Sequence, residues 1–191
     1  MSILKSLTEF FLDFLETIIV ALVIFLVLYM FIFQPHQVKG QSMYPTLHNG
    51  EYLLTNKLTY RFREPEVGDI IVFRAPSHEE LDYIKRIVAL PGDRVKLLDG
   101  KFYINGYELN ESEYLSSDVK TTQERYLLEG TEVVVPPNSY FVAGDNRPNS
   151  SDSRDFGPVP YQNIVGIAWF RYWPPQNLGL VQNGEILKNE N

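Results

Sequence analysis

The longest apolar stretch of the chain lies near its N-terminus. From Phe14 to Phe33 the only charged residue is Glu16. A helix of about twenty residues spans about 30 Å, the thickness of a bilayer core. A cleaved signal peptide has a shorter apolar segment followed by a small-residue cleavage site, whereas Gln34-Pro35-His36 follows here. The pattern predicts an uncleaved transmembrane helix over residues 14–33, preceded by a short N-terminal segment, residues 1–13.

Beyond this segment, short apolar runs alternate with turn residues. The runs are rich in β-branched and aromatic residues, which is typical of strands. Asn105-Gly106 between two such runs is a strong β-hairpin signal. The predicted strands are residues 53–55, 69–73, 83–90, 101–104, 107–109, 132–135, 140–143 and 164–172. The pattern shows no soluble amphipathic helix of useful length.

We therefore predict a mostly β domain over residues 34–175, built as two sheets or a partly open barrel. Residues from about 100 to 130 form a polar excursion within it. Residues 176–191 are predicted to be a polar, loosely ordered tail.

Composition removes several classes of function. The 191 residues contain no cysteine and only three histidines, without the HExxH spacing of many zinc peptidases. Disulfides, thiol catalysis and cysteine metal sites are thereby excluded. The net charge of −7 argues against nucleic acid as the main partner. We expect neither a metal nor a cofactor.

Two charges interrupt the apolar run at residues 83–90. Alternate side chains of a strand share a face, so Lys85 lies with Tyr83 and Ile87, and Arg86 lies on the other apolar face. A buried, unpaired lysine readily loses its proton, and lowering its pKa from about 10.4 to near 7 takes roughly 4–5 kcal/mol. A neutral Lys85 would be a general base. The alternative is an edge strand, on which Lys85 reaches solvent and Arg86 forms a structural ion pair.

A serine that needs such a base occurs earlier in the chain. Ser42 follows Gly40, which lets the backbone turn, and precedes Pro45, which holds the chain extended. Taken alone, Ser42 would be an ordinary turn residue. The segment from Phe33 to Ser42 is short and reaches at most ~30 Å, so the serine is predicted to lie close to the bilayer.

Three motifs follow one another in order: GQSMYPTL around Ser42, DYIKRIVALPGDRV around Lys85, and GDNRPNSSDSRDFG from Gly144. Together they resemble type I signal peptidases, membrane-bound serine proteases with a Ser-Lys dyad, over roughly residues 35–175. The resemblance implies that Ser42 attacks the scissile carbonyl and that Lys85 is its general base. The implied function is removal of N-terminal signal peptides from exported preproteins. The size and single span are similar to Gram-positive or cyanobacterial members.

The third motif has the composition of a hydrated turn, and the resemblance gives it a structural role. Ser150 is expected to hydrogen-bond the amine of the general base and orient it. Asp145 is expected to pair with Arg86, and a buried guanidinium does require a carboxylate. Asp152 and Arg154 are expected to form a second pair that fixes the loop.

The resemblance also bears on how a substrate would be held. The backbone N–H of Ser42 is the expected first donor to the oxyanion. Many Gram-negative relatives supply a second donor from a serine two residues before the nucleophile, where this chain has Gly40; a backbone N–H freed by the glycine geometry, or water, could substitute. Val38 and Ile84 are implied to line the pocket for the small residues before the cleavage site.

The implied location is the plasma membrane, with the N-terminus in the cytoplasm and the catalytic domain on the outer face. Flanking charges alone do not fix that orientation. The expected partners are signal peptides of exported preproteins and the lipid bilayer, and the oligomeric state is left open. Two other classes share parts of the pattern: a self-cleaving regulator of the LexA type, and a non-catalytic membrane-anchored β module.

Overall fold

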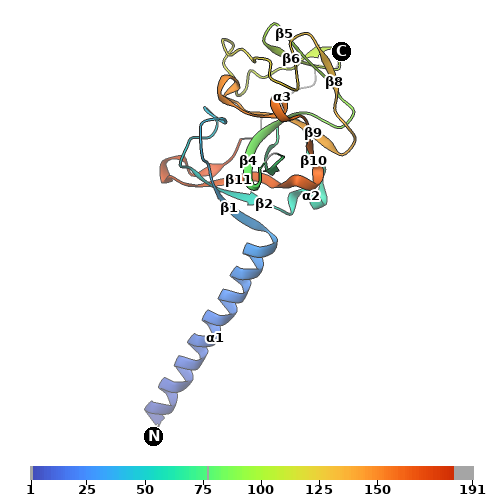
Figure 1. The fold of residues 1–191 in the computed structure, drawn as a ribbon. Helices are drawn as coiled ribbons and strands as arrows, with labels where there is room; N and C mark the ends of the chain where they lie inside the picture. The colour runs from blue at the N-terminus through green and yellow to red at the C-terminus, as the bar shows by residue number, and fades with distance from the viewer. Residues whose placement is uncertain (1, 77, 183–191) are drawn as a thin grey trace.

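The computed structural model describes residues 2–76 and 78–182. Helix α1, Ser2–Phe31, extends as a single rod from a β-rich body, with the N-terminus at its far end (Figure 1). Its segment Lys5–Tyr29 has a mean hydropathy of 2.6 and is long and apolar enough to cross a membrane.

The predicted bounds of this helix were wrong at both ends. It already begins at Ser2, so residues 2–13 are helical, and it ends at Phe31. Phe33 instead opens a strand and pairs with Asn56. Pro35 explains the early end, because the residue before a proline disfavours the helical conformation and proline itself has no N–H to donate.

The larger sheet has eight strands in the order β1-β2-β11-β3-β4-β9-β10, with β12 paired to β11. Its pairings are antiparallel. The strands are β1 Phe33–Gln37, β2 Tyr52–Asn56, β3 Ile70–Ala75, β4 His78–Ala89, β9 Ser139–Ala143, β10 Val159–Pro160, β11 Ile164–Trp173 and β12 Gly179–Leu180.

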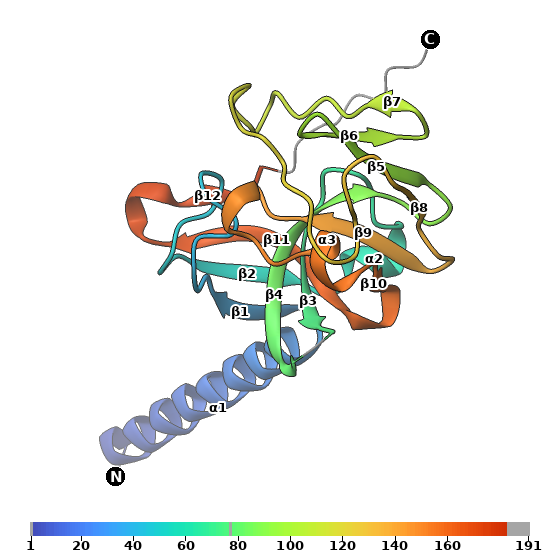
Figure 2. The same cartoon turned by 45° about the horizontal axis from the view of Figure 1, so that its top comes forward.

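The smaller sheet caps the end of the body that lies away from α1 (Figures 1 and 2). Its strands are β5 Arg94–Leu98, β6 Lys101–Ile104, β7 Tyr107–Glu108 and β8 Glu132–Val134, in the order β7-β6-β5-β8. Asn105 and Gly106 have φ values of 54° and 90° and join β6 to β7. Positive φ at both central residues is what a tight hairpin turn requires, so the predicted hairpin is confirmed.

The remaining elements are single turns of helix. They are α2 Thr59–Phe62, α3 Ser153–Phe156, and the 3-10 turns η1 Arg147–Asn149, η2 Tyr161–Asn163 and η3 Pro175–Asn177. The mostly β fold class is confirmed. The predicted loose tail was wrong up to residue 182, because Leu180 pairs with Phe170 of β11 and Val181 is buried. Residues 183–191 lie outside the described residues.

Strand β3 has apolar packing on both faces, and this decides the environment of its neighbour β4. Ile70 and Val72 pack in one buried cluster with Met43 and Leu47, whereas Ile71 and Phe73 pack in another, as the alternation of a strand dictates. Strand β4 lies between β3 and β9. From Arg86 onward β4 is therefore a central strand, and the charged residues Lys85 and Arg86 are both placed in the interior.

The larger sheet also curls. His36 of β1 lies 3.0 Å from the carboxylate of Asp82 in β4, although β2, β11 and β3 separate these strands in the sheet order. A flat sheet would keep strands so separated far apart, since neighbouring strands are about 4.8 Å from each other. The curled sheet agrees with the predicted partly open barrel.

Candidate active site

Lys85 of β4 points toward Ser42, which belongs to the segment after β1. The Lys85 side-chain amine, Nζ, lies 2.8 Å from Ser42 Oγ and donates a hydrogen bond to the Ile84 carbonyl at 3.0 Å. Proton transfer between a nucleophile and a base requires about 2.6–3.2 Å. The structure therefore brings the two predicted catalytic residues to reacting distance.

The interior position of Lys85 changes its basicity. The residue is only 4% exposed. Burial lowers the pKa of Lys85 from its ordinary value to about 8, although the carboxylates of Asp152 and Asp145 act in the opposite direction. The alternative in which Lys85 reaches solvent from an edge strand was wrong. An appreciable share of the amine is neutral near neutral pH and can accept a proton.

The nucleophile segment is held by the loop that follows β9. The backbone N–H of Asn146 donates to the Ser42 carbonyl at 3.0 Å, and the Asn146 side-chain amide donates to the Gln41 carbonyl at 3.0 Å. Met43 and Leu47 anchor the same segment in the apolar cluster beneath it. The position of Ser42 is thus fixed by hydrogen bonds to Asn146 on one side and by the packing of Met43 and Leu47 on the other.

Arg86 and Asp145 form the predicted ion pair, and both side chains are fully buried. Arg86 Nε and Nη2 donate to the two carboxylate oxygens at 2.9 and 2.8 Å, and Nη1 donates to the Gly68 carbonyl at 2.9 Å. The Thr46 hydroxyl donates to the same carboxylate at 2.5 Å. Asp145 therefore connects β4, at the position after Lys85, to the segment that carries Ser42.

Asp152 and Arg154 form the second predicted pair, also fully buried. Arg154 Nε and Nη2 donate to the Asp152 oxygens at 2.8 Å each. The same carboxylate accepts the backbone N–H of Gly144 at 3.0 Å and caps α3 through the Arg154 N–H. The pair fixes the loop from residue 144 to residue 154, as the resemblance implied.

The expected hydrogen bond between Ser150 and the Lys85 amine is not formed. Ser150 is buried in this loop, but within the described residues its hydroxyl has no hydrogen-bond partner. The amine makes its hydrogen bonds with Ser42 and the Ile84 carbonyl instead. Ser150 is nevertheless close to the nucleophile segment, because a Cβ built on Gly144 would lie 2.2 Å from Ser150 Oγ and 2.4 Å from the Ser42 carbonyl oxygen.

Sequence reasoning assigned no role to Arg147, although it lies within the third motif. Arg147 is buried, donates from Nε to the Gly144 carbonyl at 3.0 Å, and forms an ion pair with Glu111 of the polar excursion. Tyr114 of the same excursion donates to Glu111 and lies 3.9 Å from the Arg86 guanidinium, face-on. The position of Arg147 within the third motif could have suggested a structural role. Its partner Glu111 lies 36 positions away, and no local pattern in the sequence indicates that pairing.

The dyad opens into a cleft of about 290 Å³. Val38 and Ile84 lie in its lining together with Ser42 and Lys85, where the resemblance placed them. The other lining residues are Gln37, Lys39, Gly40, Gln41, Met43, Asp82, Tyr83, Asn149 and Ser151.

Gly40 does not supply the second hydrogen-bond donor to the oxyanion, and its importance lies in its backbone conformation. Its N–H is already donated to the Asn49 side chain at 2.9 Å, so the idea that this N–H serves the oxyanion was wrong. Its φ of +93° is one that side-chain-bearing residues rarely adopt. Within the described chain, the N–H of Ser42 has no acceptor and remains free for an oxyanion.

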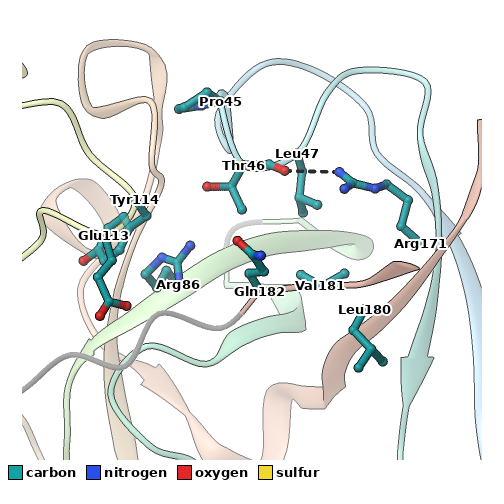
Figure 3. A pocket seen from close by; sticks show the side chains of 10 residues that line it. All are labelled: Pro45, Thr46, Leu47, Arg86, Glu113, Tyr114, Arg171, Leu180, Val181 and Gln182. Carbon is teal, nitrogen blue, oxygen red and sulfur yellow. Dashed lines mark hydrogen bonds between the residues drawn. The ribbon is translucent and has the colours of Figure 1, made fainter. Parts of the chain in front are cut away.

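A larger cavity, of about 600 Å³, borders the next part of the same segment at Pro45, Thr46 and Leu47 (Figure 3). Arg86 and Arg171 contribute to its lining. The Arg86 guanidinium is already paired with Asp145, and Arg171 donates to the Thr46 carbonyl and to Glu51. The lining contains no pair of a nucleophile and a base. Size alone therefore does not identify the reactive site, and the chemistry favours the smaller cleft.

The profile of the family described as "Signal peptidase, peptidase S26" matches residues 11–173, which include the dyad, both ion pairs and most of the β body. The chain belongs to the signal peptidase family. It is therefore a serine protease by class, and this favours the peptidase over the self-cleaving regulator and the non-catalytic module.

Known signal peptidases align over most of this chain. "Probable signal peptidase I-1" of Synechocystis is 38% identical over 90% of this chain and 87% of its own length. "Signal peptidase IB" of Staphylococcus aureus is 36% identical over 93% of this chain and 97% of its own length. The chloroplastic "Thylakoidal processing peptidase 1" of Arabidopsis thaliana is 39% identical over 76% of this chain, which covers 43% of that longer protein.

A crystal structure of a signal peptidase I from Enterococcus faecalis is 34% identical and covers 55% of this chain and 97% of its own, with a TM-score of 0.47.

The Arg86–Asp145 pair leads to a stability prediction. Asp145→Ala leaves a buried cation unpaired and should lower the free energy of unfolding by roughly 3–5 kcal/mol. The double change Arg86→Met with Asp145→Leu should recover most of this loss, because it removes both charges. Both tryptophans lie in β11, so their fluorescence during denaturant unfolding in detergent micelles reports on the β body.

The control for this measurement is Glu132→Ala. Glu132 lies 4.0 Å from Arg94, with both side chains exposed, so its loss should change stability by less than about 1 kcal/mol. Wild-type stability of Asp145→Ala would contradict the structural role of the pair.

Gly40 leads to an activity prediction. Gly40→Ala and Gly40→Ser should both lower the peptidase rate, by about tenfold, because a positive φ costs about 1–2 kcal/mol for residues with a Cβ. Crowding is not the cause, since nothing lies within 4 Å of a Cβ built there. Gly106→Ala is the matched control, with a φ of +90° and open space in the β6–β7 turn, and should keep the rate. A wild-type rate for Gly40→Ala would refute the geometric role.

Proposed function

We propose that this chain is a membrane-anchored endopeptidase that removes N-terminal signal peptides from exported preproteins, with Ser42 as nucleophile and Lys85 as general base. The observation that carries the proposal is the 2.8 Å separation of Ser42 Oγ and Lys85 Nζ inside a cleft. Family membership supports the same reaction class, since signal peptidases act on the signal peptides of preproteins.

The neutral amine of Lys85 takes the Ser42 proton as Oγ attacks the scissile carbonyl. The resulting ammonium gives that proton to the leaving amine, and an acyl-enzyme on Ser42 remains. Lys85 then takes a proton from a water molecule, whose oxygen attacks the ester carbonyl. The ester bond to Ser42 breaks, and the Lys85 ammonium gives the proton to the departing Oγ. The free N–H of Ser42 stabilises the oxyanion in both steps, and water supplies the second hydrogen bond.

The cleft has two strand edges to which an extended peptide can add. Residues 82–85 of β4 pair with β3 on one side, and β9 joins the other side only from Arg86 onward. Strand β1 pairs with β2 and has its other edge toward the cleft. A peptide lying between these edges would gain backbone hydrogen bonds, with Val38 and Ile84 lining the pocket for its small side chains.

The helix α1 is proposed to anchor the enzyme in the plasma membrane, with the N-terminus in the cytoplasm and the β body on the outer face. Its apolar segment Lys5–Tyr29 supports a single span. Only Ile32 separates α1 from β1. The cleft is thereby held near the bilayer, where a membrane-inserted precursor presents its cleavage site.

The proposal predicts cleavage of an exported precursor in trans by the purified chain in detergent. Ser42→Ala and Lys85→Ala should each abolish cleavage, and the double variant should be no worse, because both act in one proton-coupled attack. Lys85→Arg should also be inactive, since arginine stays protonated. Gel analysis of precursor and mature product measures each outcome.

Matched controls are Ser117→Ala and Lys101→Arg, at exposed positions outside the cleft. Both should cleave at the wild-type rate. Turnover by Lys85→Arg would remove Lys85 from the mechanism. Cleavage of the chain itself without cleavage of the precursor would favour a self-cleaving regulator, and no cleavage would favour a non-catalytic module.

The lowered pKa of Lys85 predicts the pH dependence of the reaction. The base must be neutral to act, so kcat/KM should rise with pH and reach half its maximum near pH 8, where Lys85 titrates. A solvated lysine would instead give a half-point near 10.4. Initial rates on one precursor peptide from pH 6 to pH 11 distinguish the two. A half-point near 10 would show that burial does not control the base.

A further inference from the structure

A side-chain bridge joins β1 to β4 beside the cleft, at Asp82 of its lining. His36 Nε2 of β1 lies 3.0 Å from Asp82 Oδ2 of β4. A carboxylate only accepts hydrogen bonds, so Nε2 carries the donated hydrogen. The other ring nitrogen, Nδ1, lies 2.8 Å from the hydroxyl of Thr55, a buried residue of β2. The imidazole is thus fixed between the two strand walls.

The bridge adjoins the pair of residues that line the substrate pocket. Asp82 and Ile84 lie two residues apart in β4, so their side chains point to the same side of that strand. His36 lies two residues before Val38, which follows the end of β1. Within the described residues, two side-chain hydrogen bonds join these cleft walls: Ser42 with Lys85, and His36 with Asp82.

We propose that the His36–Asp82 bridge sets the width of the cleft beside Val38 and Ile84, and so makes His36 and Asp82 positioning residues that restrict the pocket to small side chains. The inference rests on the proposed function, because it concerns the substrate pocket of that reaction. The bridge determines which side chains the substrate pocket accepts, whereas the dyad carries out the chemical step.

The physical argument is that the walls are not joined by backbone hydrogen bonds along this stretch. Residues 82–85 pair with β3 alone, and β1 pairs with β2 alone, in the described part of the chain. Side-chain contacts therefore hold the gap: Val38 and Ile84 belong to one apolar cluster, and the His36–Asp82 bridge is the polar contact beside it. Without the bridge, the stretch from Asp82 to Ile84 loses that polar contact with β1, and a larger side chain can enter.

The test uses pairs of signal-type peptides that are identical except at one position, which is alanine in one peptide and leucine in the other. One pair is made for each of the three positions before the scissile bond. Binding is measured by fluorescence anisotropy on full-length protein carrying Ser42→Ala, and cleavage is measured on the active enzyme. In wild type, one of these positions should strongly favour alanine, since a pocket separates such side chains by about 10–200-fold.

Asp82→Ala and His36→Ala should each lower that alanine preference by about tenfold, and the change should lie in KM more than in kcat. Their double variant should be no worse than either single variant, because both remove one interaction. Asp82→Asn should keep most of the preference, since an amide oxygen still accepts the Nε2 hydrogen.

Glu80→Ala is the matched control, because it removes one carboxylate from the same strand at an exposed position outside the cleft lining. An unchanged preference in Asp82→Ala and His36→Ala, an equal change in Glu80→Ala, or absence of binding in the Ser42→Ala protein would overturn the bridge. Binding that depends on the bridge, without precursor cleavage by the active enzyme, would overturn the proposed function and leave the bridge intact.

Discussion

A guanidinium removed from water needs a carboxylate beside it, and in this chain the fully buried Arg86 has Asp145. Asp145 also accepts the Thr46 hydroxyl, so one carboxylate joins β4, the loop after β9 and the nucleophile segment. These three pieces of chain are distant in sequence. The distance between Ser42 and Lys85 depends on their being held together.

The same arrangement explains why two adjacent cations behave differently. Asp145 and Asp152 are the carboxylates that favour the charged form of Lys85, yet both already accept two hydrogen bonds from an arginine, Arg86 and Arg154 respectively. Among residues 2–76 and 78–182 no carboxylate forms an ion pair with Lys85, and desolvation is the largest influence on its pKa. Each arginine is paired with a carboxylate, whereas the amine of Lys85 loses its proton more readily than an exposed lysine does.

Much of the fold could be predicted where the signal is local. The apolar run at residues 83–90 indicated a buried strand, and Asn105-Gly106 indicated the hairpin. Strand β1 was missed because Pro35 and His36 are typical of a loop, and only pairing with β2 makes them a strand. Strand β12 was missed because its two residues carry no periodicity and are defined by β11.

The site shows the same division. Ser42, Lys85 and the two ion pairs could be identified because their motifs are contiguous in sequence. The Glu111–Arg147 pair and the His36–Asp82 bridge join residues on separate elements, and no local pattern marks them. The orientation of Ser150 depends on rotamers and on its contact with Gly144, which composition does not encode.

The junction between α1 and β1 has a mechanical consequence. Ile32 donates to Leu28 in the helix and accepts from Lys57 at the end of β2, and Phe33 stacks on Trp169 of β11 at 5.2 Å. These contacts make the connection between α1 and the β body rigid. If α1 crosses a bilayer, this rigid connection holds Ser42 at a fixed distance from the membrane surface. The position of the cut in a precursor would then be set by the distance of its cleavage site from the membrane surface.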